Sequence, residues 1–155
     1  MMSGFQVKGI TTEIANGARE TMRSPQYGHP VYQEVLMEPS PCRHCLRVIR
    51  AGERALLFTY DPFAGDAGPL PGPIYIHSER CERYRESTKF PEELRDSPRT
   101  LAAYGSKRRM ISETLVPANG DFEGAMLTIA SNPDVRYVHV RSTTAGCFTF
   151  RANRA

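Results

Sequence analysis

The stretch YVHVRSTTAGCFTFR, residues 137–151, decides the fold. It predicts two strands, Tyr137–Arg141 and Cys147–Arg151, joined by the loop Thr144-Ala145-Gly146, in which a type I turn ends in a left-handed glycine. Pairing Arg141 with Thr149 places four apolar side chains on one face of this hairpin: Val138, Val140, Phe148 and Phe150. A shift of one residue would mix phenylalanine with arginine and histidine on both faces, so we expect this register.

The second face of the same hairpin is polar. In the expected register it carries His139, Arg141, Cys147, Thr149 and Arg151. Since successive strand residues point to opposite faces, His139, Arg141 and Cys147 are predicted to share one polar surface.

Other runs rich in β-branched and aromatic residues predict further strands. These runs are Phe5–Ile10, Val31–Met37, Ala55–Tyr60 and Pro73–His77. Leu101–Tyr104 and Met110–Val116 flank Gly105-Ser106-Lys107, which indicates a hairpin; a helix over Pro98–Tyr104 is the competing interpretation.

Helix signals are fewer. Thr11 and Thr12 offer a cap for a helix that carries Ile14, Ala15 and Ala18, and Glu92 and Glu93 after Pro91 suggest a helical first turn. Asp121 can cap a helix ending near Asn132-Pro133, and its apolar stripe is Phe122, Ala125, Met126, Ile129 and Ala130.

These elements predict an α+β fold: a single domain over residues 1–155, with a mainly antiparallel sheet and two or three helices. The segment Asp61–Pro73 holds three glycines and four prolines and is expected to be a long loop of the kind that often covers a site.

Composition excludes several classes of protein. The chain has 155 residues, 40% of them hydrophobic, and no run of about 18 apolar residues that would span a membrane. The first ten residues do not resemble a secretory signal, so we expect a cytoplasmic protein with reduced thiols. Seventeen of the 20 basic residues are arginines, but they alternate with glutamates, which indicates a solvated surface rather than a nucleic-acid stripe.

The spacing of the cysteines is the main indication of a chemical function in this sequence. PCRHCLR, residues 41–47, contains Cys42-x-x-Cys45, which is half of a zinc site, and His77-x-x-x-Cys81 would complete it. One hypothesis is therefore a zinc-binding structural or interaction module with ligands Cys42, Cys45, His77 and Cys81. It requires these side chains to lie within about 4 Å of one another. Alternatively, the cysteines are ordinary core residues of an interaction protein, and an exposed edge strand near Phe5–Ile10 would support a homodimer.

The favoured hypothesis needs no cofactor, and the zinc module is its alternative. Arg43, His44 and Arg47 would lower the thiol pKa of Cys42 or Cys45 and favour a reactive thiolate. His77 or His139 would act as the acid or base, and Arg47 with Arg141 would hold a small anionic molecule. This hypothesis describes a small enzyme or ligand-binding protein, with catalytic candidates Cys42, His44, Cys45, His77, His139 and Cys147.

Four segments resemble a known family. They are PCRHCLR (41–47), GE-x3-LFTYDPF (52–63), GPIYIHSERCERY (72–84) and YVHVRSTTAGCFTFR (137–151), and together they resemble the bacterial domain-of-unknown-function family 1203 from about Phe5 to Arg151. The resemblance implies a single-domain cytosolic bacterial protein without an assigned activity. Its pattern emphasises Cys42, His44, Cys45, Arg47, His77, Cys81, His139, Arg141 and Cys147. The segment Ala67–Pro71 departs from the family pattern.

Overall fold

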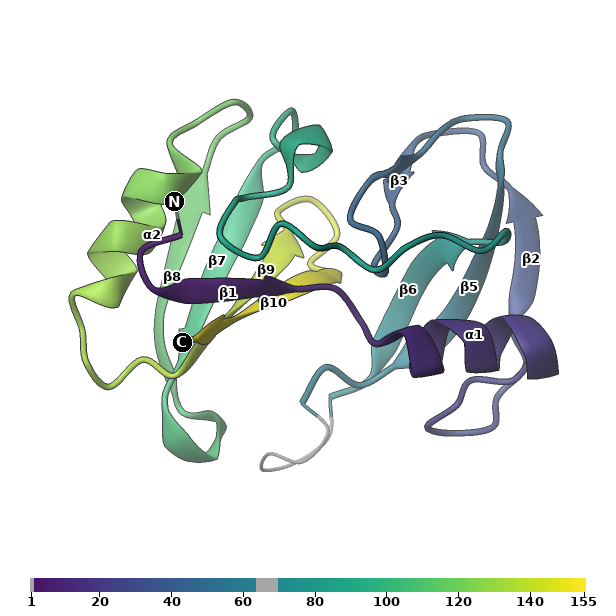
Figure 1. Ribbon diagram of the computed structural model, residues 1–155, viewed down its shortest axis with the longest axis horizontal. Coiled ribbons are helices and arrows are strands. Elements are labelled where there is room, and N and C mark those ends of the chain that lie inside the picture. Colours follow the sequence, from purple (N-terminus) through teal and green to yellow (C-terminus); the bar gives the residue numbers. More distant parts are fainter. Residues whose placement is uncertain (1, 64–69) are drawn as a thin grey trace.

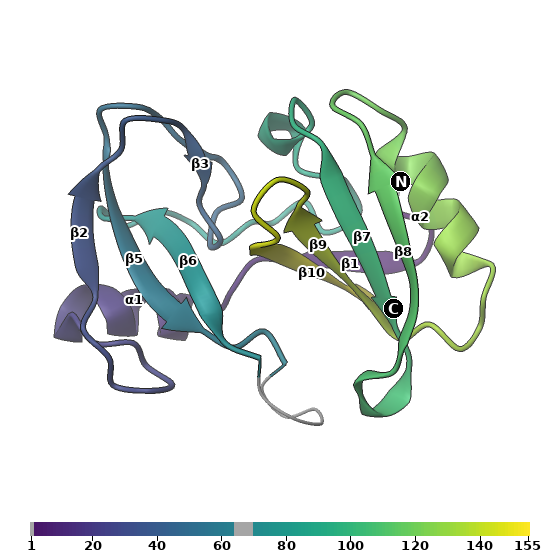
Figure 2. The same ribbon diagram turned by 180° about the vertical axis from the view of Figure 1, so that it is seen from behind.

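Two antiparallel sheets lie side by side in the computed structural model, which describes residues 2–63 and 70–155 (Figures 1 and 2). The larger sheet has the strand order β1-β10-β9-β7-β8. Its strands are β1 (Phe5–Lys8), β7 (Arg99–Tyr104), β8 (Met110–Val116), β9 (Tyr137–Ser142) and β10 (Phe148–Arg154). The smaller sheet has the order β2-β5-β6, with β2 (Tyr32–Val35), β5 (Arg54–Tyr60) and β6 (Gly72–His77).

Short elements complete the fold. A two-stranded ribbon joins β3 (Ser40–Pro41) to β4 (Val48–Ile49). The described residues also form helices α1 (Thr12–Thr21) and α2 (Phe122–Ala130) and the 3₁₀ turns η1 (Glu92–Leu94) and η2 (Ser106–Arg108). The predicted α+β class with mainly antiparallel sheet is confirmed.

Each sheet has a core of its own. The inner face of the larger sheet packs against the predicted stripe of α2, so that Val140 and Phe150 share a cluster with Phe122 and Met126. The smaller sheet packs against α1; its cluster includes Ala15, Ala18, Leu56, Ile74 and Ile76. No helix of the described chain is long and apolar enough to cross a membrane.

Both helices begin where the caps predicted. The Thr11 hydroxyl accepts a hydrogen bond from the Ile14 amide at 3.2 Å, and Asp121 Oδ1 accepts one from the Gly124 amide at 2.9 Å. Each cap satisfies one of the amides that a helix leaves without a partner in its first turn. The β7–β8 hairpin is also confirmed, so the competing helix over residues 98–104 is wrong.

The predicted register of the β9–β10 hairpin is confirmed away from the turn and is wrong next to it. Val140 pairs with Phe150, but Arg141 pairs with Phe148 rather than Thr149, because a bulge lies between Phe148 and Phe150. The loop is one residue longer than predicted: Ser142 donates its amide to the Cys147 carbonyl, and Gly146 is left-handed (φ +73°) as expected. The bulge absorbs the extra residue.

This bulge overturns the expected division of the hairpin into an apolar and a polar face. Phe148 lies on the His139 side and joins the core of the smaller sheet. His139 is fully buried, with its ring 4.5–5.4 Å from the rings of Phe63, Tyr104, Tyr137 and Phe148. The predicted polar surface shared by His139, Arg141 and Cys147 is therefore wrong.

Two other expectations concern segments at the edge of the fold. The strand β1 is an edge strand, but the Val7 amide donates to the Ser87 carbonyl at 2.8 Å, so the chain near Ser87 covers part of that edge. The homodimer stays a prediction. Of the expected loop Asp61–Pro73, residues 64–69 lie outside the described residues, and with them the first three residues of the departing segment Ala67–Pro71.

A buried arginine connects the two halves of the molecule. Arg43, in the loop between β3 and β4, is 4% exposed and donates Nε to the Phe148 carbonyl of β10 at 2.9 Å. Its Nη1 donates to the Pro41 carbonyl at 2.7 Å and to the Ser40 hydroxyl at 3.2 Å. Burial lowers the pKa of Arg43 to about 10. The two carbonyls and the hydroxyl stabilise the buried guanidinium charge by accepting its hydrogen bonds.

We expect Arg43→Ala to destabilise the protein by about 2–4 kcal/mol, because it removes the donor to two carbonyls and leaves a cavity. Urea unfolding measures the change. The exposed Arg109, which bonds through its backbone to Gly105 and Ser106, provides the matched control Arg109→Ala, expected to change stability by less than about 0.5 kcal/mol. Equal effects of the two substitutions would refute a bridging role for Arg43.

Candidate metal centre

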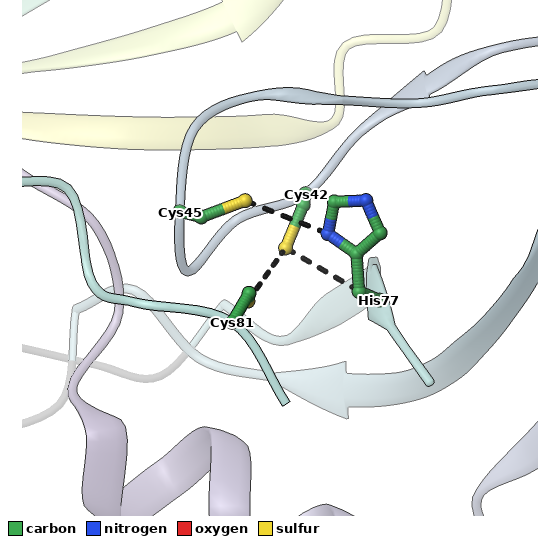
Figure 3. Close-up of side chains that lie close together, drawn as sticks. All are labelled: Cys42, Cys45, His77 and Cys81. Carbon is green, nitrogen blue, oxygen red and sulfur yellow. Dashed lines mark hydrogen bonds between the residues drawn. The ribbon is translucent and has the colours of Figure 1, made fainter. Parts of the chain in front are cut away.

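Three thiols and one imidazole converge between the β3–β4 ribbon and the end of β6 (Figure 3). The ligand atoms of Cys42, Cys45, His77 and Cys81 all lie within 4.8 Å of one another. Cys42 Sγ is 3.9 Å from Cys81 Sγ, and Cys45 Sγ is 3.5 Å from His77 Nδ1. These are the four residues of the metal hypothesis, and the two distances agree with the expected separation of about 4 Å. The group could hold a metal ion.

The first two thiols face the same way because the chain reverses sharply between β3 and β4. The Cys42 amide donates to the Arg47 carbonyl, and the Leu46 amide donates to the Cys42 carbonyl, both at 2.9 Å. Leu46 adopts a left-handed conformation (φ +59°), which costs a leucine about 1–2 kcal/mol. Its side chain is buried in the core of the larger sheet, and this burial offsets the cost.

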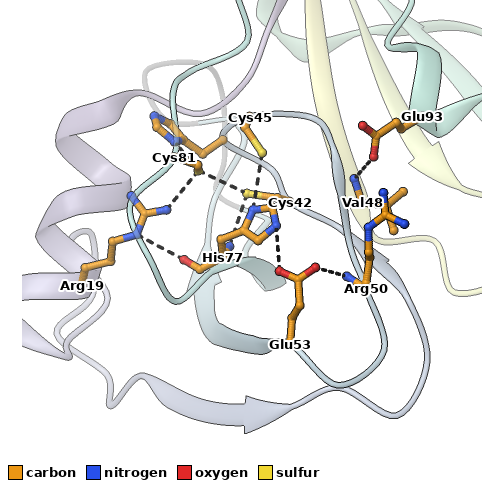
Figure 4. Close-up of polar contacts among 10 residues, drawn as sticks. Arg19, Cys42, Cys45, Val48, Arg50, Glu53, His77, Cys81 and Glu93 are labelled. Atoms are coloured by element: carbon orange, nitrogen blue, oxygen red, sulfur yellow. Dashed lines mark hydrogen bonds and ion pairs between the residues drawn. The ribbon is translucent and has the colours of Figure 1, made fainter.

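His77 is oriented from both sides of its ring. It is the last residue of β6, and Nδ1 faces Cys45 while Nε2 lies 3.7 Å from Glu53 Oε2 (Figure 4). Glu53 is held in turn by the Arg50 amide, which donates to Oε1 at 3.1 Å. A carboxylate behind a histidine ligand is the usual means of fixing its tautomer and orientation.

Hydrogen-bond donors surround the sulfur atoms. The His77 amide donates to Cys42 Sγ at 3.3 Å, and Arg19 Nη2 of α1 donates to Cys81 Sγ at 3.3 Å. His44 Nδ1 lies 3.2 Å from the same Cys81 Sγ, and its Nε2 lies 2.9 Å from the Thr12 hydroxyl. Donors of this kind stabilise thiolates, which are the form that binds metal.

The ionisable groups of the cluster shift one another's pKa values. The neighbouring Cys42 and Cys45 side chains, with His44 and His77, lower the pKa of Cys81, whereas hydrogen bonds to Cys42 and Cys81 raise the pKa of Cys45. Hydrogen bonds to Cys42 and Cys81 also raise the pKa of His77 to about 10. Without a metal ion, Cys45 stays a neutral thiol and the protonated His77 ring balances the negative charge on Cys81. A metal ion would replace these protons, so its affinity rises with pH.

The cluster opens to solvent on one side. Cys42 is fully buried, but Cys45, His77 and Cys81 line a cleft of about 1040 Å³. Arg47, a predicted anion ligand, lines the same cleft. An ion can therefore reach the four ligand atoms from this side.

The structure does not bring the remaining predicted site residues to this cluster. His139 is enclosed by aromatic rings, and Arg141 donates to the Gly146 carbonyl at 3.3 Å and does not line the cleft. Cys147 is half-buried beside Arg43. A clamp of Arg47 with Arg141 is not formed; the other roles given to these residues stay predictions.

Sequence reasoning missed three residues around the cluster. Arg19 and Thr12 belong to α1, and Glu53 belongs to a turn; none lies near Cys81 or His77 in the chain, and Arg19 is 62 residues from Cys81. No local pattern marks such contacts. An arginine near the end of a helix suggests only a favourable interaction with the helix dipole.

A family model matches residues 39–154, which begin just before Cys42 and include all four clustered residues. The chain belongs to the family described as Protein of unknown function (DUF1203). The match begins later than the Phe5 start that the resemblance suggested. Neither the curated proteins nor the solved structures contain a significant match to this DUF1203 chain.

Gly9 lets β1 and α1 approach the Cys-x-x-Cys loop. The Ile10 amide donates to the Arg43 carbonyl at 2.9 Å, and a Cβ on Gly9 would lie 2.4 Å from the His44 carbonyl oxygen. We expect Gly9→Ala to destabilise the protein by about 1–3 kcal/mol, because backbone must shift to relieve the overlap. Thermal unfolding measures the loss.

The matched control is Gly72→Ala in β6, where an added Cβ would meet no atom within 4 Å. Equal melting temperatures for Gly9→Ala and Gly72→Ala would contradict the close approach at Gly9.

Proposed function

We propose that this protein binds one zinc ion through Cys42, Cys45, His77 and Cys81 and that the ion has a structural role. The observation that carries the proposal is the spacing of the ligand atoms. A tetrahedral zinc ion separates two sulfurs by about 3.8 Å and a sulfur and a nitrogen by about 3.5 Å. The Cys42–Cys81 and Cys45–His77 distances, 3.9 and 3.5 Å, match these two values.

The donor set supports zinc over harder cations. Thiolate and imidazole ligands favour zinc, whereas magnesium and calcium prefer oxygen. Three thiolates and one neutral imidazole leave a zinc complex with one net negative charge, and the Arg19 guanidinium at Cys81 Sγ offsets it. Four protein ligands fill the tetrahedral shell, as is typical of structural sites.

The structural role follows from what the four residues connect. Cys42 and Cys45 belong to the β3–β4 loop, His77 ends β6, and Cys81 lies beyond it. Through Cys81 the site also reaches Arg19 of α1. The smaller sheet has three strands. A metal bound between short elements of this kind contributes directly to folding stability.

One observation favours a second candidate function, a metal-free thiol enzyme. Cys45 Sγ and His77 Nδ1 form a thiol–imidazole pair at 3.5 Å on the wall of the cleft. Such a pair activates cysteine nucleophiles. A zinc ion would bind both groups and remove the nucleophile, so metal content separates the two functions.

We expect untagged protein to contain about one zinc per chain by plasma mass spectrometry. In a thiol titration of the same sample, Cys147 should react at once and the other three cysteines only after chelation. Cys81→Ser should lose most of the zinc, and the control Cys147→Ser, outside the cluster, should retain it. Metal-free protein with one unusually fast thiol would support the thiol enzyme, and metal-free protein with four slow thiols would leave neither function standing.

Arg19→Met keeps the length of the side chain and removes its donor to Cys81. We expect it to weaken zinc binding by about 10- to 100-fold, because groups that hydrogen-bond to metal ligands contribute that much to affinity. Competition with a chromophoric chelator measures this change. Glu20→Gln, on the same helix but paired with the exposed Arg80, is the control and should leave affinity unchanged. Equal affinities for both variants would show that Arg19 does not stabilise the thiolate.

A further inference from the structure

The cleft beside the metal centre has two unlike walls. One is the chain from Cys45 to Arg54, which includes β4 and the turn before β5; the other is the segment from His77 to Glu86. Glu92 and Glu93 of η1 complete the lining. Most charged side chains along the second wall have partners among the described residues. Arg80 pairs with Glu20, Arg85 pairs with Glu82, and Arg83 donates to the Gly9 carbonyl.

The first wall differs because its arginines have no such partners. Arg47, Arg50 and Arg54 are exposed and line the cleft, and no side-chain hydrogen bond or ion pair of theirs occurs within the described ranges 2–63 and 70–155. Glu53, between them, is already engaged by His77 and the Arg50 amide. Three guanidiniums within eight residues therefore line the cleft without an ion-pair partner of their own, whereas Glu92 pairs with Arg95 and Glu93 accepts from the Val48 amide.

Their backbones are held even though the side chains are free. The Arg47 carbonyl accepts from the Cys42 amide, the Arg50 carbonyl accepts from Glu53, and the Arg54 carbonyl accepts from Ser78. The backbone positions that carry the three side chains are therefore fixed by the Cys-x-x-Cys loop, by a tight turn and by the chain at the end of β6. Guanidinium groups placed in this way bind carboxylates and phosphates with paired hydrogen bonds.

We infer that Arg47, Arg50 and Arg54 form a binding site for a small anion, carrying phosphate or carboxylate groups, in the cleft next to the metal centre. The inference rests on the proposed function in that zinc holds the loop bearing Arg47. The anion binds beside the metal and not to it, since four protein ligands already complete the shell.

The opposite wall limits the size of the ligand. Glu79 and Glu86 line it without side-chain partners among the described residues. These carboxylates repel an extended polyanion that would fill the whole cleft, while a compact anion can stay on the arginine side. The site therefore favours a small molecule over a nucleic acid.

Isothermal titration calorimetry of zinc-loaded protein at low ionic strength tests the site, with pyrophosphate and citrate as the two probes. We expect one anion per chain, and the stronger probe indicates whether phosphate or carboxylate is the preferred group. Arg47→Ala, Arg50→Ala and Arg54→Ala should each weaken binding about tenfold, the loss expected for a charge-assisted hydrogen bond. Arg109→Ala, an exposed arginine outside the cleft, should not, and Glu79→Gln should strengthen binding.

Zinc content is measured on every sample, so that the two proposals can fail separately. Protein that carries its zinc but binds neither probe, or binds them equally well in all three arginine variants, overturns the anion site and leaves the zinc centre intact. Protein without zinc whose anion binding still depends on the three arginines overturns the zinc proposal and retains the anion site. All variants are exposed-residue substitutions, and unchanged melting curves confirm that they fold.

Discussion

The convergence of three thiols and an imidazole within 4.8 Å is the constraint on which the smaller half of the molecule depends. Groups that carry negative charge at such distances repel one another unless protons or a cation lie between them. The chain meets this constraint with a left-handed Leu46, a histidine at the end of a strand, the Arg19 donor from α1 and the His44 ring of the β3–β4 loop. Helix, ribbon and sheet therefore all meet at the sulfur atoms.

A second connection joins that half to the larger sheet. Arg43 lies between Cys42 and His44 in the chain, yet its side chain turns away from the thiols and donates to β10. The same loop thus places its cysteines and its arginine on opposite sides. Distortion of the loop would disturb the candidate metal centre and the contact between the sheets together, which couples the site to the stability of the whole fold.

The site also shows that the residues which suggest a reactive cysteine in the sequence occupy separate places in three dimensions. Positive residues beside a cysteine predict a nucleophile. Here Arg43 donates to the backbone of β10, His44 lies between Cys81 and Thr12, and Arg47 lies on the wall of the cleft. Residues adjacent in the sequence thus have three different roles because the loop that carries them is sharply bent.

Local chemistry in the sequence determined most elements of this protein: the Thr11 and Asp121 caps, the stripe of α2, the β7–β8 hairpin and the two ligand pairs, because each depends on residues a few positions apart. Tertiary structure alone decided the rest. The bulge that moves Phe148 to the His139 side depends on packing against the second sheet, and the contacts of Arg19 and Glu53 with the ligands join distant segments. Neither the bulge nor these contacts leaves a periodic pattern in the sequence, because both depend on which surfaces pack together after the strands and helices have formed.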